Sequence, residues 1–182
     1  MLAGVLSWVI ALCCSLLFVT AGLQKLADLP RHRELLADYR VLPARWLTPV
    51  ARVLPWLELA VGVAWLAAPM HAIAAAASAA LLTIYALAMG INLRRGRHHI
   101  SCGCGGVSAG GTTLISSRLV WRNLLLACLA LWAGQISVLS GWTWLHGLTV
   151  LVASLSITLL YGTAQQLFAN GEAIRQWRVR RA

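Results

Sequence analysis

Apolar residues along this chain form five long runs that are separated by shorter polar segments. The runs cover about 2–23, 47–68, 71–93, 119–139 and 142–167. An α-helix rises 1.5 Å per residue, so about 20 apolar residues cross the hydrocarbon core of a bilayer, and every run meets that length. The pattern predicts an all-α membrane protein, a compact bundle of about five transmembrane helices in a single integral membrane domain over residues 1–182.

Two connections between the runs are very short. Pro69 and Met70 separate the second run from the third, and Ser140 and Gly141 separate the fourth from the fifth. Helices joined by so few residues lie antiparallel, so each pair is expected to form a hairpin. Segment 30–43, between the first two runs, instead carries apolar residues at helical spacing and predicts a short amphipathic helix at the membrane interface.

The composition agrees with a membrane protein. Hydrophobic residues make up 60% of the chain and charged residues 11%, whereas soluble domains are about 25% charged. No large soluble domain fits beside the five runs. The first run has no basic residue ahead of it, so it is interpreted as a retained span and not as a cleaved signal peptide.

The net charge of +10 follows the expected topology. Most basic residues lie in the loops 24–46 and 94–118 and in the tail 168–182, whereas the opposite connections carry no Lys or Arg. With five spans these three segments share one face, which the positive-inside rule assigns to the cytoplasm. We therefore expect a membrane protein with its N-terminus outside and its C-terminus in the cytoplasm. The lipid bilayer, and not nucleic acid, is the expected partner of this charge.

The loop 94–118 contains the residues best suited to chemistry. Cys102 and Cys104 flank Gly103, which lets the backbone turn sharply enough for the two sulfurs to meet. A disulfide closed across one residue is strained, and strained, exposed disulfides exchange readily. The motif therefore predicts a redox-active pair, with two idle thiols as the alternative.

Other polar side chains precede these thiols in the same loop. The charges of Arg94, Arg95 and Arg97 favour thiolate over thiol, which is the nucleophilic form. His98 and His99 follow, and together with the two thiols they offer two nitrogen and two sulfur ligands to Zn²⁺ or a copper ion. No spacing here matches a standard zinc signature, so metal binding is the alternative to thiol chemistry.

Glu58 lies near the centre of the second run. An acidic residue at that depth is costly and marks a functional hypothesis. A structural ion pair that holds helices together explains it equally well. The candidate partners of this carboxylate are Lys25 at the end of the first run, Arg52 earlier in the same run, and Arg122 early in the fourth.

Three further cysteines, Cys13, Cys14 and Cys128, fall near mid-depth in the first and fourth runs. Cysteine packs as a small hydrophobic residue inside a helix bundle, which favours a structural interpretation. A second, buried thiol station is the other interpretation.

Several short segments in a fixed order resemble a known family. They are FVTAGLQKL at 18–26, YRVLP at 39–43, LPWLE at 54–58, NLRRG at 92–96, the Cys102-Gly103-Cys104 motif and the Arg122-Asn123 pair. In these segments the chain resembles the methylamine-utilisation MauE proteins, part of the wider MauE/DoxX group of redox-associated membrane proteins. The family's cysteine motif is similar to Cys-x-Cys-Phe-Gly, and Gly105 stands here in place of the Phe.

The resemblance implies a four-helix DoxX-like core plus one further helix, in a multi-pass inner-membrane protein needed to mature methylamine dehydrogenase. The small subunit of that enzyme is periplasmic and rich in disulfides, so the helper is expected to act in thiol–disulfide chemistry. Cys102 and Cys104 are then the redox pair. The residues expected to support them are Glu58, Arg122, Asn123, Lys25, Arg94, Arg95 and Arg97.

The leading hypothesis is an integral membrane thiol–disulfide oxidoreductase or electron relay. It would exchange with a thioredoxin-like protein or with the disulfide-rich client. The exchange needs no cofactor, although a quinone would fit a relay. Two alternatives stay open: a metal-handling membrane protein that binds Zn or Cu through its His and Cys residues, and a non-catalytic DoxX-like subunit of a quinone-linked complex. Because the charges place the cysteines on the cytoplasmic side, a relay across the membrane would reconcile them with a periplasmic client. An inverted topology is the alternative, which the arginine distribution disfavours.

Overall fold

The computed structural model describes residues 2–97, 100, 114–136 and 144–181. These residues form six α-helices and a short 3₁₀ helix, so the all-α prediction is confirmed. The helices are α1 (Leu2–Ala27), α2 (Leu29–Tyr39), α3 (Ala44–Ala64), α4 (His71–Arg94), α5 (Ser117–Gly134) and α6 (Trp144–Arg181), with the 3₁₀ helix over Ala68–Met70.

Four helices in the described part of the chain are long and apolar enough to cross a membrane. They are Ala3–Ala27 of α1, Ala44–Ala64 of α3, His71–Arg94 of α4 and Trp144–Ala164 of α6. The chain is therefore a multi-pass membrane protein. The predicted fourth span, 119–139, corresponds to α5, which has 18 residues and carries Arg118, Arg122 and Asn123 in its first two turns. Those polar residues set α5 apart from the other long helices.

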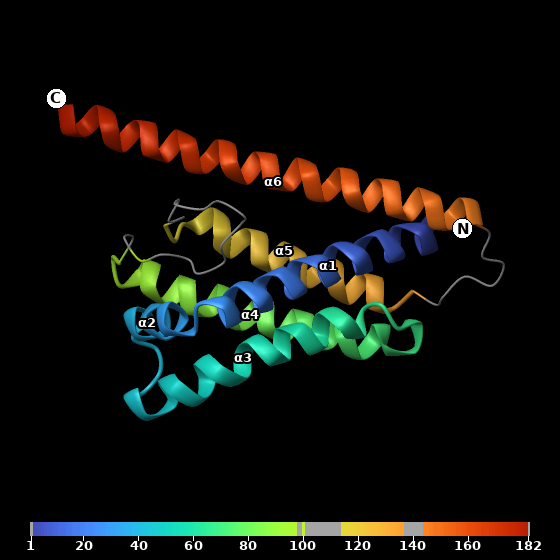
Figure 1. Cartoon of the computed structure of the whole chain (residues 1–182), viewed down its shortest axis with the longest axis horizontal. Helices are drawn as coiled ribbons and strands as arrows, with labels where there is room; N and C mark the ends of the chain where they lie inside the picture. The colour runs from blue at the N-terminus through green and yellow to red at the C-terminus, as the bar shows by residue number, and fades with distance from the viewer. Residues whose placement is uncertain (1, 98–99, 101–113, 137–143, 182) are drawn as a thin grey trace.

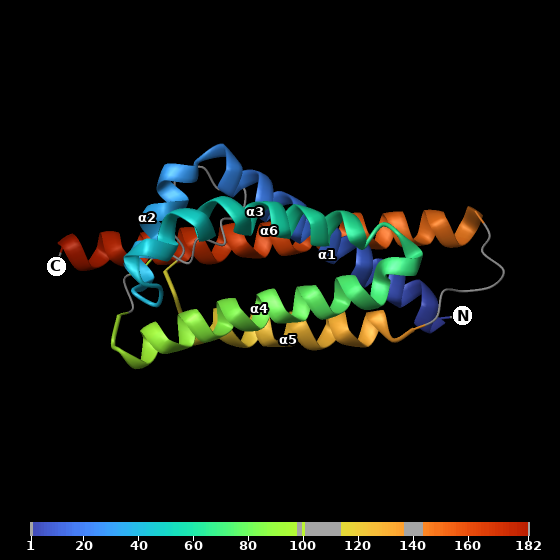
Figure 2. The ribbon, with the colours of Figure 1, turned by 90° about the horizontal axis from the view of Figure 1, so that it is seen from below.

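Helix α1 lies at the centre of the bundle, where it packs against α2, α3, α5 and α6. The most extensive contact joins α4 and α5, which lie side by side and antiparallel in both views (Figures 1 and 2). The hairpin predicted at Pro69 and Met70 is confirmed, because the 3₁₀ helix connects α3 to α4 there. Ser140 and Gly141 lie outside the described residues. The long α6 packs mainly against α1 and not against α5.

The predicted amphipathic helix between the first two spans is α2. The Asp28 side chain caps its start by accepting a hydrogen bond from the Arg31 backbone N–H at 3.1 Å. It ends at Arg40, whose φ of 47° puts the backbone in the left-handed region. Helix α2, the C-terminal end of α4 and the C-terminal end of α6 all lie at one end of the bundle (Figure 1).

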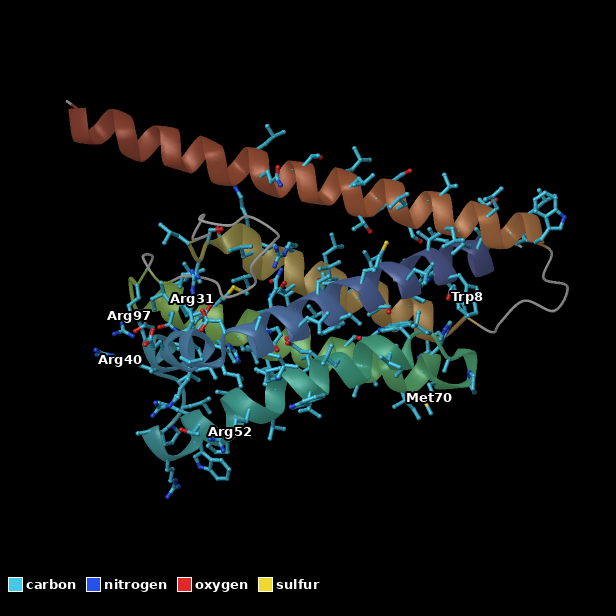
Figure 3. The ribbon with its side chains drawn as sticks, in the orientation of Figure 1. Trp8, Arg31, Arg40, Arg52, Met70 and Arg97 are labelled. Carbon is cyan, nitrogen blue, oxygen red and sulfur yellow. The ribbon has the colours of Figure 1, made fainter. Side chains whose placement is uncertain are left out.

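Figure 3 labels Arg31, Arg40, Arg52 and Arg97 at this end, and Trp8 and Met70 at the other. The basic segments of the described chain therefore gather at one end, which we call the basic end. This arrangement agrees with the shared face expected from the charge pattern.

Small residues allow the helices to approach closely. A Cβ atom added at Gly134 of α5 would overlap the Cβ of Ala75 of α4. A Cβ added at Gly62 of α3 would lie 2.7 Å from the Cγ2 of Val19 and 3.1 Å from the Ser15 carbonyl oxygen, both on α1. Backbones that come this close maximise van der Waals contact, which drives helix association in a bilayer.

This packing predicts that Gly62→Ala destabilises the protein. The extra methyl group overpacks the α1–α3 contact, so the free energy of unfolding should fall by about 1–3 kcal/mol, measured as the unfolding midpoint in mixed SDS–detergent micelles. Gly90→Ala is the matched control, since a Cβ at Gly90 meets nothing within 4 Å. The control should leave stability unchanged or raise it by about 0.5–1 kcal/mol. Equal effects of the two substitutions would contradict the close contact.

Candidate functional site

Glu58 is 1% exposed and forms the centre of a polar cluster inside the bundle. Its Oε1 oxygen accepts hydrogen bonds from the Lys25 ammonium and from the Tyr85 hydroxyl, the latter at 2.5 Å. The Lys25 nitrogen also lies 5.0 Å from the centre of the Tyr85 ring. We call these three residues, from α1, α3 and α4, the buried polar cluster.

The helical periodicity of α3 explains why Glu58 points into the bundle. On α3, Glu58 shares a buried stripe with Ala51, Pro55 and Gly62, which follow one another at the spacing i, i+4, i+7 and i+11. The stripe faces α1 and α4. Because its other members are small or apolar, Glu58 has no access to water along α3 and must find its partners on the neighbouring helices.

The ion pair between Lys25 and Glu58 is the one carboxylate–cation contact within 4.0 Å among the described residues. The second carboxylate oxygen of Glu58, Oε2, is buried and has no hydrogen-bond partner in that part of the chain. A buried pair of opposite charges is much cheaper than either charge alone. The cluster therefore has no net charge when Lys25 and Glu58 are both ionised.

The structure selects one of the three candidate partners of Glu58. Lys25 is within salt-bridge distance, whereas Arg52 is exposed on the surface of α3. Arg122 donates to the side-chain oxygen of its neighbour Asn123 on α5 at 3.3 Å, and Asn123 itself is buried. Sequence reasoning missed Tyr85. A tyrosine deep in an apolar helix was the available signal, since a buried phenol usually needs a hydrogen-bond partner.

His32 of α2 is buried close to the cluster. Burial, together with the nearby positive charge of Lys25 as the smaller cause, lowers the pKa of His32 to about 4. The imidazole is therefore neutral at physiological pH. Its Nε2 atom is buried without a hydrogen-bond partner among the described residues.

Side chains at the C-terminal end of α4 hold α2 in place. The amide of Asn92, which is fully buried, donates to the Tyr39 carbonyl at 2.9 Å. Arg95 donates to the Arg40 carbonyl at 3.1 Å, and Arg97 donates to the Asp38 carbonyl at 3.2 Å. These bonds satisfy carbonyls at the end of α2 that have no partner within the helix. Arg95 and Arg97, predicted to act on the thiols, thus also bind α2.

The two described ends of the loop 94–118, which we call the cysteine loop, are Ile100 and Ile115, and they are bonded to each other beside α4. The Ile115 backbone N–H donates to the Ile100 carbonyl at 3.0 Å. Both side chains are buried against Met89, and Tyr85 and Leu119 pack against this group. The loop therefore starts and ends beside the tyrosine of the buried polar cluster. The predicted residues His98, His99, Cys102 and Cys104 lie outside the described residues.

The other three cysteines are free. Cys14 is buried in the main hydrophobic core, and Cys13 contacts Thr158 and Ser154 of α6. Cys128 is exposed on α5. Their different surroundings favour the structural interpretation over a second thiol station. Among the described residues, no group of three or more His, Cys, Asp or Glu side chains could hold a metal ion.

The buried polar cluster predicts that Lys25→Met is strongly destabilising. The substitution leaves the Glu58 carboxylate buried without its counter-charge, which should lower the free energy of unfolding by about 3–5 kcal/mol. The double variant Lys25→Met/Glu58→Gln removes both charges and should recover most of that loss. Arg52→Met is the control, since it removes an exposed cation at a cost within about 0.5 kcal/mol. Unfolding midpoints in mixed micelles test the set, and a Lys25→Met protein as stable as the wild type would exclude the buried pair.

Comparison with known proteins places this architecture in a family. The family model described as methylamine utilisation protein MauE matches residues 3–136, which include α1 to α5. The chain is 38% identical over 174 residues to the methylamine utilization protein MauE of Paracoccus denitrificans, covering 91% of this chain and 92% of that protein.

Two further relatives carry the same name. The protein from Methylophilus methylotrophus is 32% identical over 151 residues, covering 82% of this chain and 79% of its own length. The protein from Methylorubrum extorquens is 31% identical over 152 residues, covering 82% and 80%. No solved structure matches. From the family match and these identities over most of its length, the chain belongs to the methylamine utilisation protein MauE family.

Proposed function

We propose that this protein serves methylamine utilisation by supporting thiol–disulfide chemistry at the bacterial inner membrane. Its client would be a periplasmic, disulfide-rich enzyme of the methylamine dehydrogenase type, whose small subunit needs its disulfides formed or rearranged. Membership of the MauE family supports the link to methylamine utilisation. The Cys102-Gly103-Cys104 motif supports the thiol chemistry.

The observation that carries the proposal is the anchoring of the cysteine loop. Ile100 precedes Cys102 by two residues, and its side chain is buried against Met89, beside Tyr85. The backbone bond to Ile115 holds the far end of the loop at the same place. A reactive motif carried on a fixed base is easier to present to a partner than one on a free linker.

The proposed reaction is an exchange through a mixed disulfide. A thiolate of Cys102 or Cys104 attacks a disulfide in a thioredoxin-like partner, which forms one S–S bond to the partner and breaks the partner's own. The partner's leaving thiolate takes up a proton. The second cysteine then loses its proton and attacks the mixed disulfide, which closes the Cys102–Cys104 disulfide and releases the partner as a dithiol. The reverse sequence oxidises the partner, and neither direction requires a cofactor.

We further propose that five helices cross the membrane with the basic end in the cytoplasm. Helix α5 would cross together with α4, against which it packs along its length, and Arg118, Arg122 and Asn123 would lie toward the cytoplasmic end. The N-terminus is then outside and the C-terminus inside. Because the cysteine loop starts at the basic end, electrons destined for a periplasmic client must be relayed across the bilayer.

The exchange mechanism predicts a trapped intermediate. Cys104→Ser, or the reciprocal Cys102→Ser, removes the resolving thiol, so the remaining cysteine should accumulate a mixed disulfide with its partner. The measurement is a non-reducing gel of membranes after acid quenching, with reductant reversing the shift. Cys128→Ser is the control, since Cys128 is exposed on α5 and is not part of the Cys102-Gly103-Cys104 motif, and it should trap nothing. Absence of an adduct in both loop variants would rule out the exchange.

The proposed topology predicts from which side of the membrane the loop cysteines can be labelled. With Cys13, Cys14 and Cys128 replaced by Ser, a membrane-impermeant maleimide should reach Cys102 and Cys104 in inverted vesicles after reduction and not in intact spheroplasts. Met70→Cys, in a background that also lacks the loop cysteines, gives the opposite signal, because Met70 is exposed at the other end of the bundle (Figure 3). Labelling of the loop cysteines from outside would contradict the proposed orientation and place the basic end in the periplasm.

A further inference from the structure

Arg52 and Arg45 form an unusual stripe on the outer surface of α3. Arg45, Pro49, Arg52 and Trp56 follow one another at the spacing i, i+4, i+7 and i+11, which places them on one face of the helix, and all four are exposed. At 3.6 residues per turn, this face is rotated by about 120° from the buried Glu58 stripe. The guanidinium of Arg52 therefore points away from the carboxylate that the sequence offered as its partner.

The order of side chains along this face matches the layers of a membrane. The two arginines come first, near the basic end, followed by Trp56, which is 63% exposed. The remaining exposed residues toward the far end of α3, Ala60 and Val63, are apolar. The layers of a leaflet follow the same order: headgroup phosphates beside the arginines, then the interfacial zone that tryptophan favours, then the hydrocarbon core.

In the described part of the chain, no carboxylate lies within 4.0 Å of an arginine of this stripe. The one acidic residue of α3 is Glu58, which is buried and paired with Lys25. Helix α2 differs, because Asp28, Glu34 and Asp38 stand within the same short segment as its arginines. The two arginines of α3 are therefore exposed cations without a counter-charge on their own helix.

We propose that the Arg45–Arg52 stripe binds the headgroup phosphate of an anionic phospholipid in the leaflet at the basic end. A guanidinium binds phosphate oxygens through two parallel hydrogen bonds, and its desolvation costs less than that of an ammonium. The exposed Val53 and Leu57 flank the stripe, so acyl chains cover the apolar surface beside the headgroup. This combination of unpaired cations and adjoining apolar surface fits a lipid better than an acidic soluble protein. The site is separate from the thiol chemistry proposed above and does not depend on it.

The test uses the full chain, purified in detergent and offered equimolar phosphatidylglycerol and phosphatidylcholine, with bound lipid measured by native mass spectrometry. The wild type should retain phosphatidylglycerol preferentially. Arg45→Gln/Arg52→Gln should weaken that binding by about thirtyfold, as expected for two arginines at an anionic surface. Arg31→Gln/Arg33→Gln removes the same charge from α2 and should weaken it by less than about threefold, because nearby carboxylates already offset those arginines.

The unfolding midpoint of each variant shows whether it is folded. Arg45→Lys/Arg52→Lys keeps the charge, so it tests the site if the glutamine variant does not fold, and it should bind the lipid better than that variant. Equal losses in the α2 and α3 variants would overturn the proposal in favour of diffuse charge attraction. Displacement of the lipid by inorganic phosphate alone would also overturn it.

Discussion

The ion pair between Lys25 and Glu58 is the interaction on which the rest of this structure depends. A carboxylate in the interior of a membrane helix bundle costs several kcal/mol unless a counter-charge and hydrogen bonds replace the lost water. Here the counter-charge comes from α1 and a second hydrogen bond comes from Tyr85 of α4. Three helices must therefore keep one relative rotation and one axial position. Leucine packing alone would tolerate small shifts between them, since lipid is as apolar as the helix surfaces.

This constraint extends to the cysteine loop through a short series of contacts. The ring of Tyr85 packs beside Met89, and Met89 is buried with Ile100 and Ile115, the two described ends of the loop. Asn92, one turn further along α4, binds the end of α2. Polar bonds and close packing alternate along this face of α4, so the position of Glu58 and the base of the loop are fixed by the same helix. A substitution in the buried polar cluster is therefore expected to shift the described ends of the loop, Ile100 and Ile115, through α4.

The sequence predicts the helices well but predicts their rotations poorly. Runs of apolar residues and the Pro69-Met70 turn give α1, α3, α4 and the amphipathic α2 within a few residues, because length and hydrophobicity determine a span. Hydropathy does not say which face of a helix is inward when nearly every residue is apolar. The partner of Glu58 was therefore open among Lys25, Arg52 and Arg122, and Tyr85 was missed.

The packing of α6 was equally out of reach. A short connection implies an antiparallel neighbour, yet α6 packs mainly on α1. Helix α5 illustrates the opposite difficulty, because Arg118 and Arg122 lower its hydropathy although it packs closely against α4. In both cases contacts with other helices determine where the helix packs, and these contacts cannot be predicted from the local sequence.

Lys25 and Arg52 together explain how a basic protein distributes its charge in a membrane. Lys25 is largely buried and is paired inside the protein with Glu58, whose negative charge offsets it. Arg52 lies on the exposed surface of α3 and has no carboxylate on that surface. A buried, paired cation such as Lys25 stabilises the fold, whereas an exposed cation such as Arg52 must be neutralised by groups outside the protein. The headgroup region is the one layer of a bilayer rich in phosphate, so exposed arginines on α3 hold the bundle at a defined depth.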